Sequence, residues 1–225
     1  MSDLVSIIMP SYNTAQYITE TIQSVIDQTY HNWELIIVDD CSTDNTDIVI
    51  GKIKDPRIRY IKNEKNSGAA VSRNRALREA NGRWVAFLDS DDLWKPEKLE
   101  KQICFMMKNR YYFSYTNYEE IDADGNKTNT ETRKENEYVY GVHGSVVILR
   151  KECIDKFLED SIQIFMYGEE LYIAEKLKEN QFLSYYDKNL KIIHNENQST
   201  GKIASQRKQK WCSQSINFLV ERYWK

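Results

Sequence analysis

The chain has 225 residues, which is enough for one large domain or two small ones with a substantial core. Its formal net charge of −3 and its pI of about 5.8 argue against a protein that binds nucleic acid through a general basic surface. Glycine and proline number only 8 and 3, and no low-complexity segment occurs, so most of the chain is not expected to be disordered.

Strands and helices are expected to alternate through the first hundred residues. Short apolar runs predict buried strands at residues 4–9, 34–40, 57–61 and 84–88. Apolar residues at helical spacing, with polar loop residues before them, predict helices at residues 15–28, 44–53, 69–80 and from about 96. Alternation of this kind is typical of a parallel sheet with helices on both faces.

The pattern changes after about residue 110. Strands are expected at residues 112–121, 144–149 and 183–194, with a hairpin turn at 122–126 and a helix near 169–180. No segment rich in Pro, Gly or Ser separates the two halves, so we expect them to share one core. The predicted fold class is therefore α/β, with a doubly wound, mostly parallel sheet and a mixed C-terminal half.

The cysteines and the N-terminal residues indicate in which cellular compartment the protein is expected. The four cysteines are scattered and form no CxxC pair, which argues against a zinc site and against a disulfide framework. The N-terminus lacks a basic segment followed by a long apolar run, so no signal peptide is expected. No apolar run approaches the roughly 18 residues needed to span a bilayer. We therefore expect a cytoplasmic protein.

Three carboxylates follow directly after the predicted strand at 84–88. Asp89, Asp91 and Asp92 repel one another and resist burial, so packing alone gives no reason for them. A divalent cation such as Mg²⁺ or Mn²⁺ would resolve this conflict, because both prefer hard oxygen ligands. If the backbone is extended here, Asp89 and Asp91 point to the same side and Ser90 to the opposite one.

Two other predicted strands also end in polar residues, one before Pro10 to Asn13 and one at Asp39 and Asp40. In a doubly wound sheet these ends converge on one crevice, which is where ligands bind. A nucleotide would fit there, with Tyr12 stacked on the base and Asp39 accepting from the base or the ribose. Capping of a helix or turn is expected to explain one of the two aspartates.

Four segments in the first half resemble the nucleotide-sugar half of family 2 glycosyltransferases, which are inverting enzymes of the GT-A fold. They are residues 6–13, 34–44, 66–74 and 87–92. The resemblance covers residues 4–105 strongly and is looser beyond. It implies one GT-A domain over 1–225. That domain would have a nucleotide-sugar half at about 1–110, an acceptor half at about 111–204 and a C-terminal helix at about 205–225.

The resemblance also implies roles for individual residues. Those expected to bind the nucleotide sugar are Pro10, Tyr12, Asp39, Arg73, Asp89 and Ser90. Asp89 and Asp91 would form the DxD pair that holds Mn²⁺ or Mg²⁺, with Asp91 as the main ligand. Arg73 would approach the diphosphate, whereas Arg75 and Arg78 are expected on a solvated helix face.

The general base is expected in the second half, where Tyr167-Gly-Glu-Glu-Leu171 resembles the family's acidic motif. Family members commonly carry Glu-Asp there, so Glu170 stands in place of the expected catalytic Asp, with Glu169 in reserve. The additional methylene of Glu170 shifts the carboxylate by about 1.5 Å, which can lower the rate of the catalysed reaction. Alternatively, both glutamates only complement the dipole of the helix that they begin.

Three further residues and the C-terminal segment also have predicted roles. The resemblance implies a metal or phosphate contact for His194 and an acceptor contact for His143, although either histidine could be purely structural. Asp92 is assigned to the acceptor side, or else it orients its neighbours or begins the next helix. The segment 205–225 mixes basic and aromatic residues. It would form a helix on a membrane surface, or one that packs on the sheet or against another subunit in a homo-oligomer.

The predicted function is a metal-dependent inverting transfer of a sugar, from a nucleoside-diphosphate sugar such as a UDP-sugar to a hydroxyl acceptor. A carbohydrate or lipid-linked acceptor would suit cell-surface polysaccharide or glycolipid synthesis, at the inner face of the cell membrane. The alternative is a non-catalytic module that binds nucleotide sugars or glycans and has a degenerate base. Nucleotidyltransferases and oxidoreductases are disfavoured, because residues 11–15 do not form a glycine-rich loop.

Overall fold

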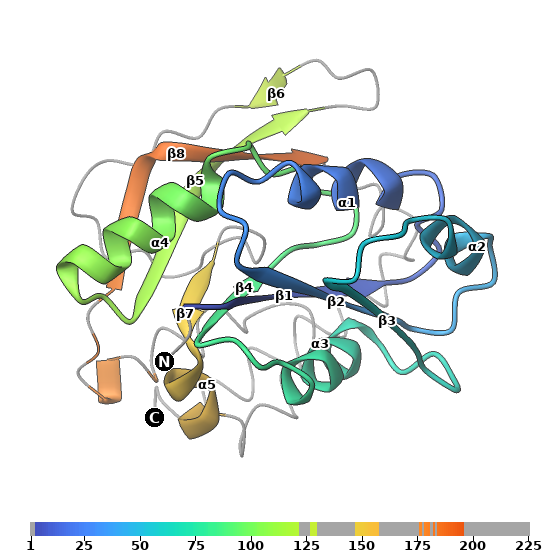
Figure 1. The fold of residues 1–225 in the computed structure, drawn as a ribbon, viewed down its shortest axis with the longest axis horizontal. Coiled ribbons are helices and arrows are strands. Elements are labelled where there is room, and N and C mark those ends of the chain that lie inside the picture. Colours follow the sequence, from blue (N-terminus) through green and yellow to red (C-terminus); the bar gives the residue numbers. More distant parts are fainter. Residues whose placement is uncertain are drawn as a thin grey trace.

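Within the part of the chain that the structure describes, one mixed sheet of eight strands organises the protein (Figure 1). The computed structural model describes residues 3–121, 127–129, 147–157, 176, 178–180, 182 and 184–195. The strands are β1 (Val5–Ser11), β2 (Trp33–Asp39), β3 (Ile58–Lys62), β4 (Trp84–Phe87), β5 (Phe113–Ile121), β6 (Lys127–Asn129), β7 (Ile148–Arg150) and β8 (Ser184–Asn195). Their order across the sheet is β3-β2-β1-β4-β7-β5-β6, with β8 beside β5.

The first four strands are parallel, as the alternating pattern predicts. β1 pairs with β2 on one side and with β4 on the other, and β2 pairs with β3. Every residue of β1 is buried, and so is all of β2 except Glu34. Strands that are covered on both faces require such continuous apolar runs.

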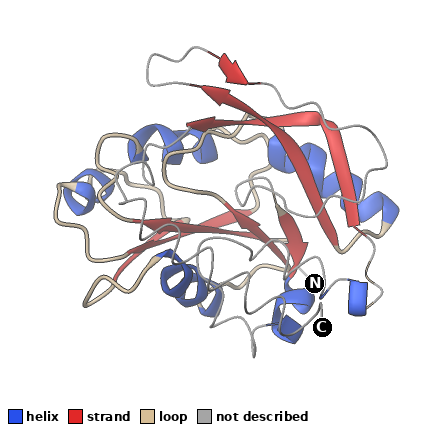
Figure 2. Ribbon diagram, turned by 180° about the vertical axis from the view of Figure 1, so that it is seen from behind, coloured by secondary structure: helices blue, strands red, loops and turns tan. Residues whose placement is uncertain are grey.

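Helices lie on both faces of the sheet. They are α1 (Ile18–Ile26), α2 (Thr46–Gly51), α3 (Ala69–Arg78), α4 (Lys98–Asn109) and α5 (Lys151–Phe157). In Figures 1 and 2, α1 and α2 lie on one side of the central strands, and α3 and α5 lie on the other. The predicted fold class is therefore confirmed.

The second half joins the sheet through antiparallel pairing. β7 lies between β4 and β5 and runs antiparallel to both, whereas β8 runs parallel to β5. The sequence pattern did not predict α5, because its short, mostly polar segment buries only Cys153 and Ile154 among its first four residues. The predicted turn at 122–126 lies outside the described residues, as does most of the predicted helix near 169–180.

Candidate functional site

The carboxyl ends of β1, β2 and β4 meet at one edge of the sheet. Ser11 at the end of β1 pairs with Asp39 at the end of β2. β4 reaches the same edge, because the N–H of Leu88 donates to the carbonyl oxygen of Ile8 at 3.1 Å. The chain after each of these strands therefore lines the region where ligands bind in open α/β sheets.

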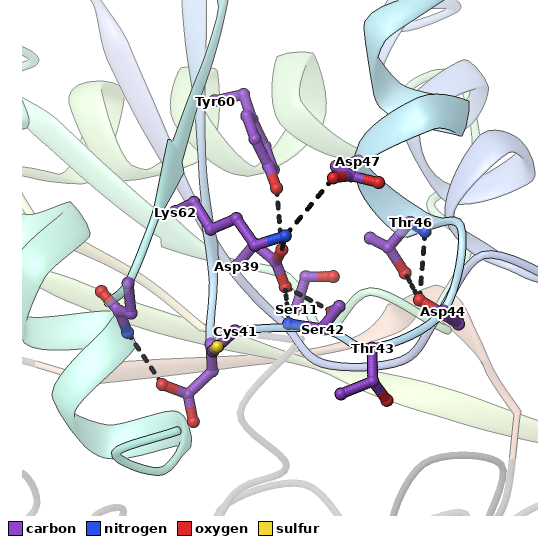
Figure 3. A network of polar contacts seen from close by, with 12 residues as sticks. Ser11, Asp39, Cys41, Ser42, Thr43, Asp44, Thr46, Asp47, Tyr60 and Lys62 are labelled. Atoms are coloured by element: carbon purple, nitrogen blue, oxygen red, sulfur yellow. Dashed lines mark hydrogen bonds and ion pairs between the residues drawn. The ribbon is translucent and has the colours of Figure 1, made fainter. Parts of the chain in front are cut away.

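Asp39 lies at the centre of a polar network at this edge (Figure 3). Its side chain is fully buried, and the backbone N–H and the hydroxyl of Ser42 both donate to Oδ1. The hydroxyl of Tyr60 donates to Oδ2 at 2.7 Å, and Nζ of Lys62 lies 3.9 Å from the same oxygen. Lys62 also forms a 3.3 Å ion pair with Asp47.

This network holds the phenol of Tyr60 in its protonated form. Burial and the hydrogen bond to the carboxylate of Asp39 raise the pKa of Tyr60 above its ordinary value, because a phenolate there would lose solvation and face a negative charge. The sequence pattern did not single out Tyr60, Ser42 or Lys62. Alternation along 57–61 does assign Tyr60 and Lys62 to one face, but the pairing with β2 appears only in the folded sheet.

Asp40 performs the capping role that was expected for one of the two aspartates. Its carboxylate accepts from the backbone N–H groups of Ser67 and Gly68, just before α3, at 2.6–3.1 Å. The amide of Asn63 donates to it at 2.8 Å. Gly68 has φ 95°, a conformation that glycine adopts without steric cost. Asp40 therefore fixes the start of the helix that carries Arg73.

The loops after β1 and β2 are joined by direct hydrogen bonds. The Asn13 side-chain oxygen accepts from the backbone N–H of Thr43 at 2.8 Å, and Asn13 itself has φ 54°. Its own N–H donates to the hydroxyl of Ser42 at 2.9 Å. Tyr12 stands beside this junction with 44% of its surface exposed, so its ring is open to a ligand. Pro10, in contrast, is buried within β1.

Arg73 on α3 and Asp89 after β4 form an ion pair at the same edge. Nη2 of Arg73 lies 2.8 Å from Oδ1 of Asp89, and the two side chains are 20% and 29% exposed. The predicted extended geometry of the acidic segment is wrong, because the chain turns at residues 90 and 91. The N–H of Asp92 donates to the carbonyl oxygen of Asp89 at 3.2 Å, so strand alternation does not apply there.

The remaining residues of the acidic segment are almost completely buried. Ser90, Asp91 and Asp92 are 5%, 4% and 0% exposed. The carbonyl oxygen of Ser90 accepts from the hydroxyl of Thr21 on α1 at 3.0 Å. The turn is thus fixed against α1, and Asp89 is the most exposed of the three carboxylates.

A backbone bridge connects this segment to β8. Leu93 and Ile193 exchange two hydrogen bonds of 2.9 Å, one in each direction. The backbone of His194 therefore lies next to the bridge, while it pairs with Glu120 of β5. Two segments about a hundred positions apart in the sequence are joined at the candidate site.

The acidic segment has the donor chemistry of a small divalent site. Asp89 and Asp91 supply two carboxylates, and Mg²⁺ is usually bound by one or two carboxylates together with substrate phosphates and water. Within the described residues, no group of three or more His, Cys, Asp or Glu side chains could hold a metal ion. The carboxylates of Asp89 and Asp91 are oxygen donors of the kind that Mg²⁺ and Mn²⁺ prefer.

Several predicted residues lie outside the described part of the chain. They are Glu169 and Glu170, expected as the base, and His143, expected at the acceptor, together with the predicted helix at 205–225. Among the helices that are described, none has the length and apolar character to cross a bilayer.

Comparison with known sequences identifies a family. The model of the family described as "Glycosyl transferase family 2" matches residues 6–157. TuaG of Bacillus subtilis (strain 168), named as a teichuronic acid biosynthesis glycosyltransferase, is 55% identical over 124 residues, or 54% of this chain and 49% of TuaG. The Escherichia coli protein WfgD is named UDP-Glc:alpha-D-GlcNAc-diphosphoundecaprenol beta-1,3-glucosyltransferase. It is 54% identical over 119 residues, or 53% of this chain and 47% of WfgD. The chain spans about half the length of these relatives.

Solved structures show the same fold. Residues 1–349 of S. aureus TarS in complex with UDP-GlcNAc align with a TM-score of 0.73 at 21% identity, over 97% of this chain and 73% of that one. The mannosyltransferase PcManGT from Pyrobaculum calidifontis, in complex with GDP-Man and Mn²⁺, aligns with a TM-score of 0.74 at 18% identity, over 96% of this chain and 64% of that one. Both likenesses concern the fold alone.

Proposed function

Because the chain belongs to glycosyl transferase family 2, we propose that it moves a sugar from a UDP-sugar to a hydroxyl acceptor with inversion at the anomeric carbon. The Arg73–Asp89 pair carries this proposal. The pair places a guanidinium, which can bind phosphate, 2.8 Å from a carboxylate, which can bind a metal ion. Both lie at the edge of the sheet where the parallel strands end.

In this proposal the donor lies along the carboxyl ends of β1, β2 and β4. Tyr12 stacks on the base, because its ring is the exposed aromatic surface after β1. Asp39 and Pro10 line the nucleoside pocket, and Ser90 and Asp89 contact the ribose. Arg73 donates to phosphate oxygens, for which the forked guanidinium is well suited.

The proposed cofactor is Mn²⁺ or Mg²⁺, held by Asp89 and Asp91 and, from β8, by His194. When bound, such a cation offsets the negative charge that a departing nucleoside diphosphate gains. Glu170 is proposed to accept the proton of the acceptor hydroxyl as its oxygen attacks the anomeric carbon, on the face opposite the leaving group. Glu169 is the reserve for this role, and His143 and Asp92 are proposed to contact the acceptor.

The acceptor is proposed to be a sugar on a lipid diphosphate, as in cell-surface polysaccharide synthesis. The name of WfgD gives a diphosphoundecaprenol-linked acceptor for that protein, and TuaG is named for teichuronic acid biosynthesis. A lipid-linked acceptor of this kind would have its apolar chain in a membrane. We therefore propose that the chain works at the cytoplasmic face of a membrane and that residues 205–225 contact the membrane or another subunit.

Thermal unfolding with a panel of UDP- and GDP-sugars tests the donor and the cofactor together. We expect a UDP-sugar to raise the melting temperature when Mn²⁺ or Mg²⁺ is present and to lose this effect when EDTA is added, because only the native state binds the pair. Stabilisation by a donor that is unchanged by EDTA would contradict the metal role of Asp89 and Asp91.

Glu170→Gln tests the chemistry itself, with Glu169→Gln as the matched control. Loss of a general base typically lowers the rate by about 10²–10⁴-fold, so we expect Glu170→Gln to lose transfer while its donor-induced stabilisation persists. If transfer and donor hydrolysis are unaffected in both variants, the base assignment is wrong. If the wild-type chain binds donors but transfers nothing, the non-catalytic module is the better description.

A further inference from the structure

The ion pair between Arg73 and Asp89 joins two groups that the proposed function assigns to different parts of one ligand. Arg73 is expected at the diphosphate and Asp89 at the cation, yet in the structure their side chains bind each other at 2.8 Å. Both side chains are mostly buried, at 20% and 29% exposure, so solvent screens the pair less than it screens a surface ion pair.

The charge of the acidic segment explains why such a pair forms. Asp89, Asp91 and Asp92 lie within four positions, and the last two are 4% and 0% exposed. Neighbouring carboxylates destabilise one another when they are desolvated. The guanidinium of Arg73 supplies a positive charge directly at the most exposed of the three, so it stabilises the segment before any ligand arrives.

The same guanidinium opposes a cation that binds alone. A divalent ion on Asp89 would lie within a few ångströms of Arg73. At such distances the repulsion between like charges reaches the order of kcal/mol when the effective dielectric constant is low. A diphosphate changes this balance, because it offers Arg73 a new anionic partner and neutralises the added positive charge. The cation and the diphosphate therefore help each other to bind.

We propose that Arg73 couples the two ligands: it pairs with Asp89 and releases that carboxylate to a divalent cation when a diphosphate takes its place. This role rests on the proposed donor site and goes beyond a phosphate contact. The coupling must be reciprocal, so the cation raises the affinity for the diphosphate by the same factor as the reverse.

Two titrations of the whole chain test the coupling in the wild type. The first follows free Mn²⁺ by electron paramagnetic resonance as MnCl₂ is added without nucleotide, and the second repeats it with saturating UDP. We expect UDP to tighten Mn²⁺ binding by about tenfold or more. Equal Mn²⁺ affinity with and without UDP, in a protein that binds both, would overturn the coupling.

Arg73→Gln isolates the residue responsible. We expect this variant to bind Mn²⁺ alone about tenfold more tightly than the wild type and to bind UDP with Mn²⁺ more weakly, because the opposing charge and the phosphate donor are both lost. Arg78→Gln is the matched control, since it removes one positive charge from an exposed position on the same helix, α3. It should change neither affinity by more than about twofold.

The outcomes separate this inference from the function on which it rests. If Arg73→Gln binds Mn²⁺ alone no more tightly than Arg78→Gln, the coupling role is wrong, while metal-dependent binding of UDP by the wild type would leave the proposed function standing. If the wild type binds no nucleotide with any cation, the proposed function fails. Arg73→Lys keeps the charge and should bind Mn²⁺ alone as weakly as the wild type does.

Discussion

Lys98 is a fully buried lysine at the start of α4. Its Nζ lies 3.9 Å from the ring centroid of Trp94, and within the described residues no hydrogen-bond partner reaches it. Burial lowers the pKa of Lys98 well below its ordinary value, because a desolvated ammonium is costly. The side chain contributes its methylene groups to the core, but its amine opposes folding.

We expect Lys98→Met to stabilise the protein by about 1–3 kcal/mol, since it keeps the apolar volume and removes the buried amine. In the wild type the unfolded chain binds one more proton than the native state between the lowered pKa and about 10.4. Stability should therefore fall by up to about 1.4 kcal/mol per pH unit as pH decreases through this window. The variant should lack that slope.

Urea unfolding of both proteins at a series of pH values measures this difference. Lys101→Met, an exposed position on the same helix, is the control and should leave the pH dependence of stability unchanged. Parallel pH profiles for the wild type and Lys98→Met would show that the amine stays charged and solvated in the native state.

The two aspartates at the end of β2 show how far a residue's role can be predicted from sequence. Both were expected at the ligand edge, and one of them was expected to be a cap. Asp40 accepts from the backbone N–H groups just before α3, whereas Asp39 binds Tyr60 and Ser42. The partners of Asp39 depend on the pairing of β2 with β3, and periodicity alone does not determine register.

At the scale of elements, the parallel strands were predictable because burial on both faces gives each one an apolar run with a polar end. The turn after β4 was not, because nothing in the local pattern shows whether a strand continues through three acidic residues. β6 has only three residues, too few for a periodic signal, whereas the apolar run at 144–149 did predict a strand that overlaps β7. Elements of this size are defined by the strands beside them.

Gly82 belongs to the connection between α3 and β4, where the backbone approaches β1 closely. A Cβ added there would lie 2.6 Å from the carbonyl oxygen of Leu4 and 2.7 Å from both N and Oγ of Ser6. The N–H of Gly82 also donates to Oγ of Ser6 at 2.8 Å. We expect Gly82→Ala to destabilise the protein by about 1–3 kcal/mol, because backbone atoms must move.

Gly51→Ala is the opposite case, at the end of α2, where an added Cβ meets nothing within 4 Å. It should stabilise the protein by about 0.4–1 kcal/mol, because alanine loses less conformational entropy on folding. Chemical denaturation of the two variants beside the wild type gives both values. A Gly82→Ala variant as stable as the wild type, or more stable, would contradict the steric argument for Gly82.

At the scale of the whole molecule, the candidate site depends on both halves of the sequence. The first half supplies the parallel strands, and β7 connects them to β5 and β8. The Leu93–Ile193 bridge then joins β8 to the residue that directly follows the acidic segment. Family motifs predicted the first contribution, but they could not predict the bridge, because it consists of backbone hydrogen bonds between residues with ordinary apolar side chains.

Ile193→Pro tests whether this bridge holds the acidic segment in position. Proline removes the N–H that donates to the carbonyl oxygen of Leu93 at 2.9 Å, whereas Ile193→Ala shortens the side chain and keeps that donor. We expect the free energy of unfolding of the proline variant to be about 1–3 kcal/mol lower than that of the alanine variant. It should also bind UDP with Mn²⁺ about tenfold more weakly, because Leu93 follows Asp91 by two positions and small displacements of ligands are costly.

Urea unfolding and a UDP titration at saturating Mn²⁺ measure the two effects. Equal affinities in the proline and alanine variants would mean that the acidic segment keeps its geometry without the bridge.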